Sequence, residues 1–181
     1  MASRISRRAF NATLVGGTLT AGTGALSQTQ EPERDYPAPT FKPTLRKPRL
    51  GSTLVQDFVI FAHYDLDMVK RLLEKDPAVL NSTVDWGGGD WESALGGASH
   101  MGRRDIATFL LEKGARIDIF AAAMLGHLDA VKAILTARPS LLEAKGPHGI
   151  PLLAHAKAGG KEAEDVLKFL EGLKVPEKPA K

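Results

Sequence analysis

Histidines and carboxylates are the residues of this chain that could bind a metal ion or move a proton. The histidines are His63, His100, His127, His148 and His155. None of them forms the His-Glu-x-x-His spacing with which one helix face binds zinc. His127 follows a glycine in a repeated phrase, which favours a structural hydrogen bond. His63 and His100 each come near the end of a predicted helix, so they could line one groove and share a metal ion or an acidic partner.

The loop around Gly87-Gly88-Gly89 carries three carboxylates, on Asp85, Asp90 and Glu92. Such a loop could hold Ca²⁺, but its spacing matches no known calcium loop and favours solvated turn residues. It also lacks the Lys-Ser or Lys-Thr that follows the last glycine of a phosphate-binding loop. Ser93 has no histidine and acid at an interpretable spacing, and we expect it to cap a helix. We therefore predict no metal site, no cofactor and no catalytic residue.

Trp86 and Trp91 flank the same glycines and are the only tryptophans of the chain. Tryptophan is enriched among the residues that dominate binding energy at protein interfaces. The pair could therefore anchor a partner on a flexible loop, or one or both rings could fold back onto neighbouring helices. The sequence leaves both interpretations open.

The elements that would position these residues are short amphipathic helices. Apolar residues recur at helical spacing in 65–75, 102–112 and 126–135, and each run has a charged outer face. Gly114 suits the left-handed residue that follows a helix end. Strand signals are almost absent, so we predict an all-α fold of about four helix-turn-helix units.

The phrase from Gly102 to Asp118 is repeated in part 24 residues later, from Gly126 to Leu135. These residues resemble the ankyrin repeat, whose unit ends in Gly-His-x-x-Ile-Val-x-Leu-Leu-Leu and Gly-Ala-Asp-Ile-Asn. The resemblance covers about two thirds of the chain, with a degenerate copy at each end. It implies a helical solenoid in which neighbouring units share one core. The chain departs from the pattern at Ser93-Ala94, Gly96 and the shortened junction at Asp118.

The resemblance also implies where a partner would bind. Ankyrin repeats usually contact partners through the fingers between repeats and through the first helices. Carried onto this sequence, that surface comprises Trp86, Asp90, Trp91, Glu92, His100, Met101, Met124 and His148. We predict a monomer that binds another protein there.

The first residues resemble an export signal. Arg7, Arg8 and Phe10 precede a weakly apolar stretch that ends in small residues near Ser27 and Gln28, which is similar to a twin-arginine signal of bacteria. A Sec-type signal or an uncleaved anchor is the alternative. We predict a protein exported to the periplasm, with no membrane span after cleavage.

The sequence predicts four parts: a signal in 1–27, a proline-rich extended linker in 28–50, the repeats in 51–173 and a polar tail in 174–181. The expected repeats are 52–85, 86–118, 119–147 and 148–173. The linker is either a plain tether or a short docking segment around Tyr36 and Phe41.

Charge and cysteine content exclude some classes. The net charge of +3 is matched by the three arginines of the predicted signal, so we expect no basic stripe for nucleic acid. Without cysteine the chain has no disulfide, no thiolate metal site and no thiol nucleophile.

Three functions remain. The first is a non-enzymatic interaction module of the cell envelope. The second is an envelope protein that binds a small ligand or a metal ion in the groove near His63 and His100. The third, a hydrolase, lacks an identifiable nucleophile and base.

Overall fold

The computed structural model describes residues 35–41, 44 and 47–173. The predicted signal at Arg7, Arg8 and Phe10, its cleavage near Ser27 and the tail 174–181 lie outside these residues. The chain divides into two units, 1–44 and 45–181. Every helix and strand of the described ranges belongs to the second unit. No helix within those ranges has the length and apolar character that crossing a bilayer requires.

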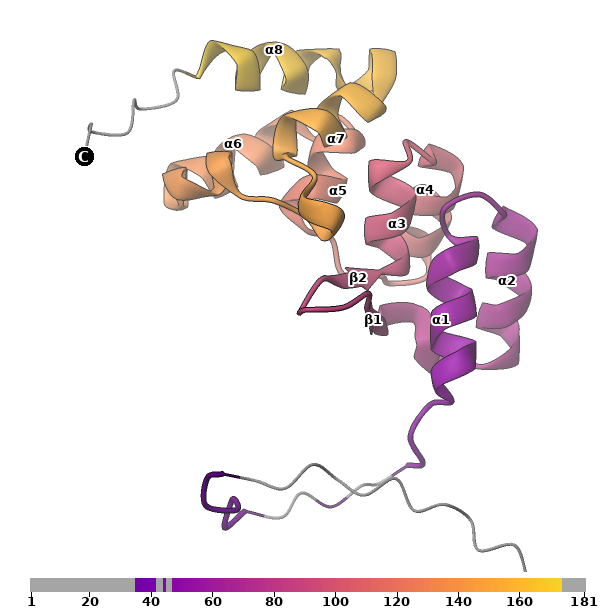
Figure 1. Cartoon of the computed structure of the whole chain (residues 1–181). Coiled ribbons are helices and arrows are strands. Elements are labelled where there is room, and N and C mark those ends of the chain that lie inside the picture. The colour runs from indigo at the N-terminus through magenta and orange to yellow at the C-terminus, as the bar shows by residue number, and fades with distance from the viewer. Residues whose placement is uncertain (1–34, 42–43, 45–46, 174–181) are drawn as a thin grey trace, which may run out of the picture. The chain divides into compact units, whose positions relative to one another are not determined.

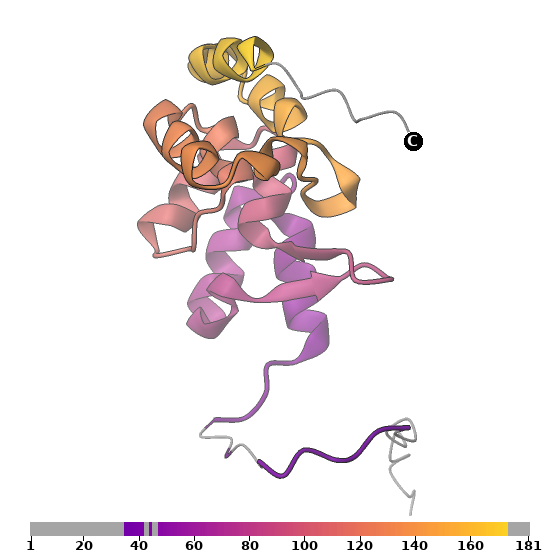
Figure 2. The same ribbon diagram turned by 90° about the vertical axis from the view of Figure 1, so that its left-hand side faces the viewer.

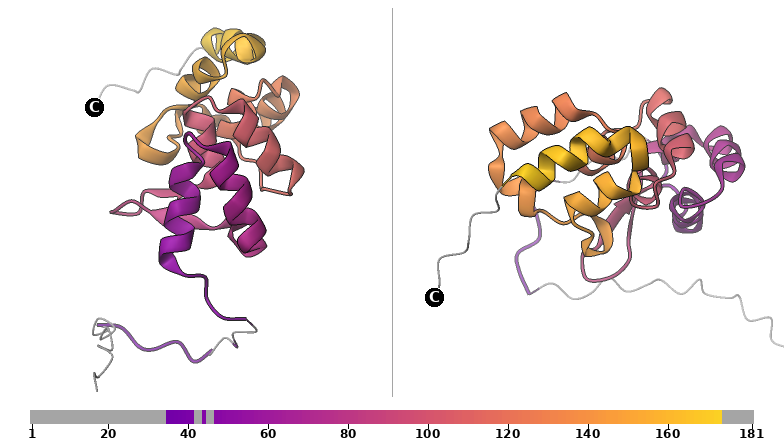
Figure 3. Two further views of the ribbon diagram at one scale, coloured as in Figure 1. Left: turned by 90° about the vertical axis from the view of Figure 1, so that its right-hand side faces the viewer. Right: turned by 90° about the horizontal axis from the view of Figure 1, so that it is seen from above.

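The fold is mostly helical, as predicted, and its helices pack in consecutive pairs (Figure 1). The pairs are α1 with α2, α3 with α4, α5 with α6, and α7 with α8. The first helices α1, α3, α5 and α7 also contact one another in that order, and α8 lies beside α7 at the outer end (Figure 3). The α-helices are α1 Ser52–Phe61, α2 Leu66–Lys75, α3 Ala94–His100, α4 Arg104–Glu112, α5 Ile119–Met124, α6 Leu128–Ala137, α7 Leu152–Ala158 and α8 Glu164–Gly172. The 3₁₀ helices are η1 Pro77–Asn81, η2 Pro139–Glu143, η3 Pro147–Gly149 and η4 Gly160–Ala163.

The all-α prediction is wrong in one place, because 83–93 form a β-hairpin that projects from the helices (Figure 2). Strands β1 (Thr83–Asp85) and β2 (Trp91–Ser93) pair antiparallel, with Val84 opposite Glu92. All three loop glycines have positive φ, from 66° to 123°, a region that other residues rarely adopt. The glycine run therefore makes a hairpin turn, which the sequence analysis treated as a plain loop.

The buried side chains form two hydrophobic clusters. The first joins α1 to α4 with one face of α5 and includes Phe58, Ile106 and Leu110, and the second joins the other face of α5 with α6 to α8 and includes Leu152 and Val166. Both consist largely of aliphatic side chains at helical spacing, as the amphipathic runs predicted. We call α1 to α4 the first half of the folded unit and α5 to α8 the second half; their two clusters meet at α5.

Side chains fix the starts of the helices that hold the site. Ser93 Oγ accepts a hydrogen bond of 3.1 Å from the Gly96 amide, which confirms its predicted capping role at α3. Asp65 and Asp118 cap α2 and α5 in the same way. Gly114 has a φ of 94° after α4, as predicted.

Candidate metal centre

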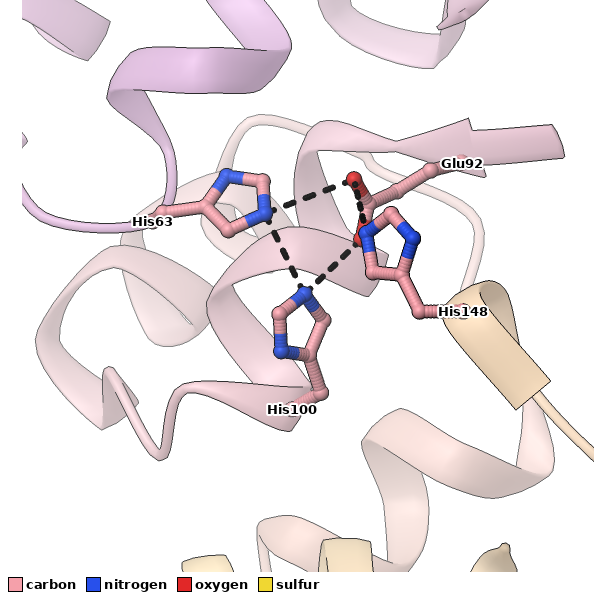
Figure 4. Close-up of side chains that lie close together, drawn as sticks. All are labelled: His63, Glu92, His100 and His148. Atoms are coloured by element: carbon pink, nitrogen blue, oxygen red, sulfur yellow. Dashed lines mark hydrogen bonds and ion pairs between the residues drawn. The ribbon is translucent and has the colours of Figure 1, made fainter. Parts of the chain in front are cut away.

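Four side chains converge where the first half of the folded unit meets the second. His63, Glu92, His100 and His148 each present one nitrogen or oxygen atom, and these atoms all lie within 4.8 Å of one another (Figure 4). Within the described part of the chain no other group of three or more histidines and carboxylates converges in this way. The four residues come from four different segments, so the group depends on the fold.

Glu92 lies at the middle of the group because strand β2 alternates its faces. Trp91 points outward and is 60% exposed, whereas Glu92 points inward and is 1% exposed. One carboxylate oxygen, Oε1, is 3.0 Å from His100 Nε2. The other, Oε2, accepts a hydrogen bond of 2.7 Å from Trp86 Nε1 and lies 3.4 Å from Nε2 of both His63 and His148. The buried carboxylate therefore touches all three imidazoles.

His63 stands on the turn that follows α1. Its Nδ1 lies 2.9 Å from the carbonyl oxygen of Val59 and 3.2 Å from that of Ile60. A carbonyl oxygen only accepts hydrogen bonds, so Nδ1 must carry the proton. In the neutral ring Nε2 is then unprotonated and faces the group with its lone pair.

Helix α3 lets the histidines of neighbouring segments approach one another, because Gly96 and Gly97 leave one of its faces without side chains. Gly97 sits directly beneath the His63 ring: a Cβ built there would lie 2.7 Å from His63 Cε1. Pro147 covers Gly96 in the same way, at 3.4 Å from the corresponding Cβ position. His100 follows on that helix face at i+3 and i+4 from these glycines. Its Nε2 is 3.1 Å from His63 Nε2.

His148 comes from the second half and is held by Asp90. Its Nδ1 is 2.9 Å from Asp90 Oδ2, and its backbone amide donates to Asp90 Oδ1, also at 2.9 Å. The carboxylate thus favours a proton on Nδ1 and leaves Nε2 free to bind a metal ion, an arrangement common around zinc. His148 also has a φ of 58°. Such strained positions in residues other than glycine cluster at functional sites.

Several separations are close to those of a tetrahedral metal site. Zinc bonds of about 2.0–2.1 Å in tetrahedral geometry place neighbouring ligand atoms ~3.3 Å apart. His100 Nε2 lies 3.1 Å from His63 Nε2 and 3.0 Å from Glu92 Oε1, and Nε2 of both His63 and His148 lies 3.4 Å from Glu92 Oε2. The remaining pairs of candidate ligand atoms lie within 4.8 Å of one another. Without a metal ion, a proton on His100 Nε2 can be shared with His63 Nε2 at 3.1 Å or with Glu92 Oε1 at 3.0 Å. An ion at the centre would replace that proton and bind both nitrogens. The geometry therefore fits one ion at the centre of the group.

Electrostatics also favour a cation. Burial alone would raise the pKa of Glu92, but hydrogen bonds from His100, His63 and Trp86 outweigh it and lower that pKa well below its usual range. The hydrogen bond to Glu92 raises the pKa of His63, against the opposing effect of burial. The carboxylate is thus kept ionised in a buried place, where an uncompensated charge is costly.

Three imidazole nitrogens and one carboxylate oxygen select among metals. This donor set suits Zn²⁺ and other divalent transition ions, whereas Ca²⁺ and Mg²⁺ prefer oxygen ligands alone. Four protein ligands fill a tetrahedral shell and leave no open position for a reacting water. The arrangement therefore favours a structural ion over a catalytic one.

The predicted partner surface is largely occupied by this site. Glu92, His100 and His148 are members of the group, and Asp90 and Trp86 bond to members of it. Two residues need correction as partner contacts, because Met124 is fully buried in α5 and Glu92 is 1% exposed. Trp91 and Met101 are 60% and 54% exposed, as a partner surface requires.

The two tryptophans have different environments. Trp86 is half-buried, bonds Glu92 and lies with its ring 6.2 Å from that of His148. Trp91 projects into solvent on the opposite face of the hairpin. Of the two interpretations that the sequence left open, folding back describes Trp86 and exposure describes Trp91.

The sequence predicted that His63 and His100 could share one groove, but it did not predict that Glu92 and His148 would join them. Glu92 was assigned to a solvated loop, and only the alternation of a recognised strand would have turned it inward. One sequence feature distinguishes His148: it stands between Pro147 and Gly149, which indicates a tight turn. The remaining two histidines lie apart: His127 is exposed and His155 is buried in the second half against Phe120.

Comparison with known proteins gives no family assignment. No protein-family model matches the chain, and no curated protein matches it either.

Proposed function

We propose that this protein binds one divalent transition-metal ion, with Zn²⁺ the best fit, through His63, Glu92, His100 and His148. The observation that carries the proposal is the convergence of three imidazole nitrogens on one buried carboxylate, at 3.0 Å for His100 and 3.4 Å for His63 and His148. The outer hydrogen bonds add support, because Val59 and Asp90 hold two of the rings with Nε2 toward the centre. This proposal develops the metal-binding alternative of the sequence analysis and sets aside the prediction of no metal site.

Calorimetry of the metal-free full chain with Zn²⁺ tests the proposal. We expect one equivalent to bind with a dissociation constant below about 1 μM, since structural zinc sites bind with large free energies. His63→Gln and His100→Gln should each weaken binding at least about 100-fold, more than the 10–100-fold that outer partners contribute. Bound Co²⁺ should give the intense visible bands of a tetrahedral ion.

His127→Gln is the matched control, because His127 is an exposed histidine outside the group. Its affinity for Zn²⁺ should equal that of the unchanged protein. Equal losses in all three variants, or no binding by the unchanged protein, would contradict the proposal.

We also propose that the protein is a non-enzymatic interaction module of the cell envelope. Trp91 and Met101 support it, because both are large apolar side chains with more than half of their surface exposed. The ankyrin-type solenoid is part of this proposal, supported by the four consecutive helix pairs and by the left-handed glycines Gly102 and Gly126 after α3 and α5. Export by a twin-arginine signal and a monomeric state are proposed with it.

Capture from the cell envelope tests the second proposal. Trp91→Ala should abolish capture of a specific partner, since truncating such an anchor typically costs ~2 kcal/mol or more, while the circular dichroism spectrum stays unchanged. Ile117→Ala is the control, because Ile117 is an exposed large apolar side chain of the same unit that lies outside the predicted partner surface. Equal capture by the unchanged protein and by Trp91→Ala would contradict the second proposal.

A further inference from the structure

The segment between α6 and α7 has little packing of its own. From Thr136 to Pro151 no residue is buried, although Leu135 before it and Leu152 after it are. Neither 3₁₀ helix of the segment contributes a buried side chain. Segments with few buried apolar contacts open locally at low free-energy cost. Leu141 and Leu142 pack, partly buried, against the second cluster, but no residue of 144–151 belongs to either cluster. Something other than a hydrophobic core must therefore order 144–151.

Most backbone hydrogen bonds at the tip of the segment are internal. Gly146 donates to Ile150, Gly149 to Gly146 and Ile150 to Pro147. These bonds shape a turn but do not attach it to the rest of the protein. Both hydrogen bonds by which the tip reaches the first half of the folded unit run from His148 to Asp90. Residue 148 is therefore the main attachment point of the tip.

The proposed ion would bind at that attachment point. His63 follows α1, and Glu92 and His100 belong to β2 and α3, all in the first half, whereas His148 is the single candidate ligand from the second half. His148 is also the outermost ligand, with 37% of its side chain exposed against 8% for His100. Three ligands thus form a fixed base, and the fourth closes over it.

We propose that the ion is a clasp: by binding His148 it fastens the tip, residues 144–151, to the first half of the folded unit. This inference rests on the proposed metal binding and adds what the ion controls. With the ion bound, opening of the tip requires breaking a metal–nitrogen bond as well as the hydrogen bonds to Asp90. Without it, the tip opens on its own while both hydrophobic clusters stay folded.

The clasp also governs a cavity of about 390 Å³ beside the hairpin. Lys145, Gly146 and Pro147 form one wall, and Asp90 and Trp91 form part of the other. Since one wall is the tip itself, the cavity keeps its form only while the tip is fastened. Metal occupancy would therefore switch a surface that carries the most exposed tryptophan of the protein.

Limited trypsin digestion of the full chain tests the clasp, because the tip contains the bond Lys145–Gly146. The bond Lys113–Gly114 has the same two residue types on an exposed turn after α4, remote from the four ligands, and serves as the internal control. If cleavage proceeds only from the open, metal-free tip, a free Zn²⁺ concentration of about ten times the dissociation constant should slow it about tenfold. Cleavage after Lys113 should change by less than about twofold.

His148→Gln separates the clasp from metal binding. The variant keeps the three-ligand base, so we expect weakened binding of one equivalent of Zn²⁺ with no protection of the Lys145–Gly146 bond. The rate after Lys113 reports whether the variant is still folded. Asp90→Asn should give partial protection, because the ion can still bind His148.

The outcomes distinguish the two proposals. If one equivalent of Zn²⁺ binds the unchanged protein but both bonds are slowed equally, the clasp is overturned and metal binding stands. If protection persists in His148→Gln, the clasp is also overturned. If no Zn²⁺ binds at all, the proposed function fails and the clasp fails with it.

Discussion

Glu92→Gln is expected to lose metal affinity by at least about 100-fold and to lower the free energy of unfolding of the metal-free protein by about 3 kcal/mol. The change keeps the size of the side chain but removes the negative charge that pairs with His63 and His100. Breaking a buried charge pair by altering one partner typically costs ~3–5 kcal/mol, and the low end applies because the amide oxygen can still accept the Trp86 hydrogen bond. Zinc calorimetry and urea unfolding measure the two effects.

Glu74→Gln is the control for this variant, because Glu74 is an exposed glutamate on α2. Its unfolding free energy and zinc affinity should match those of the unchanged protein within about 0.5 kcal/mol. A Glu92→Gln variant with unchanged affinity would show that the carboxylate is not a ligand. Loss of affinity without loss of stability would instead mean that the metal-free protein does not depend on the pairs with His63 and His100.

Gly97→Ala should weaken zinc binding at least about tenfold without touching a ligand. The added Cβ would lie 2.7 Å from His63 Cε1 and 2.9 Å from its Nδ1. The His63 ring must therefore move away from α3, and its Nε2 no longer points toward the other candidate ligands. Misplacement by about 1 Å is enough to disable a site. The helix itself should tolerate alanine, which stabilises helix interiors by roughly 1 kcal/mol relative to glycine. Calorimetry for affinity and urea unfolding for stability separate the two effects.

Gly172→Ala is the matched control. Gly172 is the last residue of α8, and a Cβ there would meet nothing within 4 Å. This variant should bind zinc normally. If Gly97→Ala also binds normally, His63 does not need its present place and is not a ligand.

The helices could be predicted from the sequence because each depends on local patterns. Apolar spacing, the caps at Ser93 and Asp118 and the left-handed Gly114 act within a few residues of one another. The hairpin was missed because its strands are three residues each, too short for an alternating pattern to stand out. Because the strands were not predicted, the inward orientation of Glu92 was not predicted either.

The metal centre could be predicted only in part, for a related reason. His63 and His100 occupy similar places in successive helical units, so sequence periodicity placed them together. His148 joins them through a tertiary contact with Asp90, 58 residues earlier in the chain. Periodicity carries no information about such a contact. The departure from the repeat at Gly96 was visible in the sequence, but Pro147, which covers that glycine in the fold, was not predicted to lie there.

Because the candidate ligands are divided between the two halves of the folded unit, they become available one after another during synthesis of the chain. A ribosome completes His63, Glu92 and His100 well before it reaches His148, and three further α-helices, α4, α5 and α6, lie between His100 and His148. An ion captured by the growing chain would have only three protein ligands, and water would fill the remaining position. The shell closes only after the third helix pair has been made and the tip that follows it has docked. A fully coordinated ion is therefore a mark of a chain folded past residue 148, and an immature chain would exchange its metal faster than the finished protein.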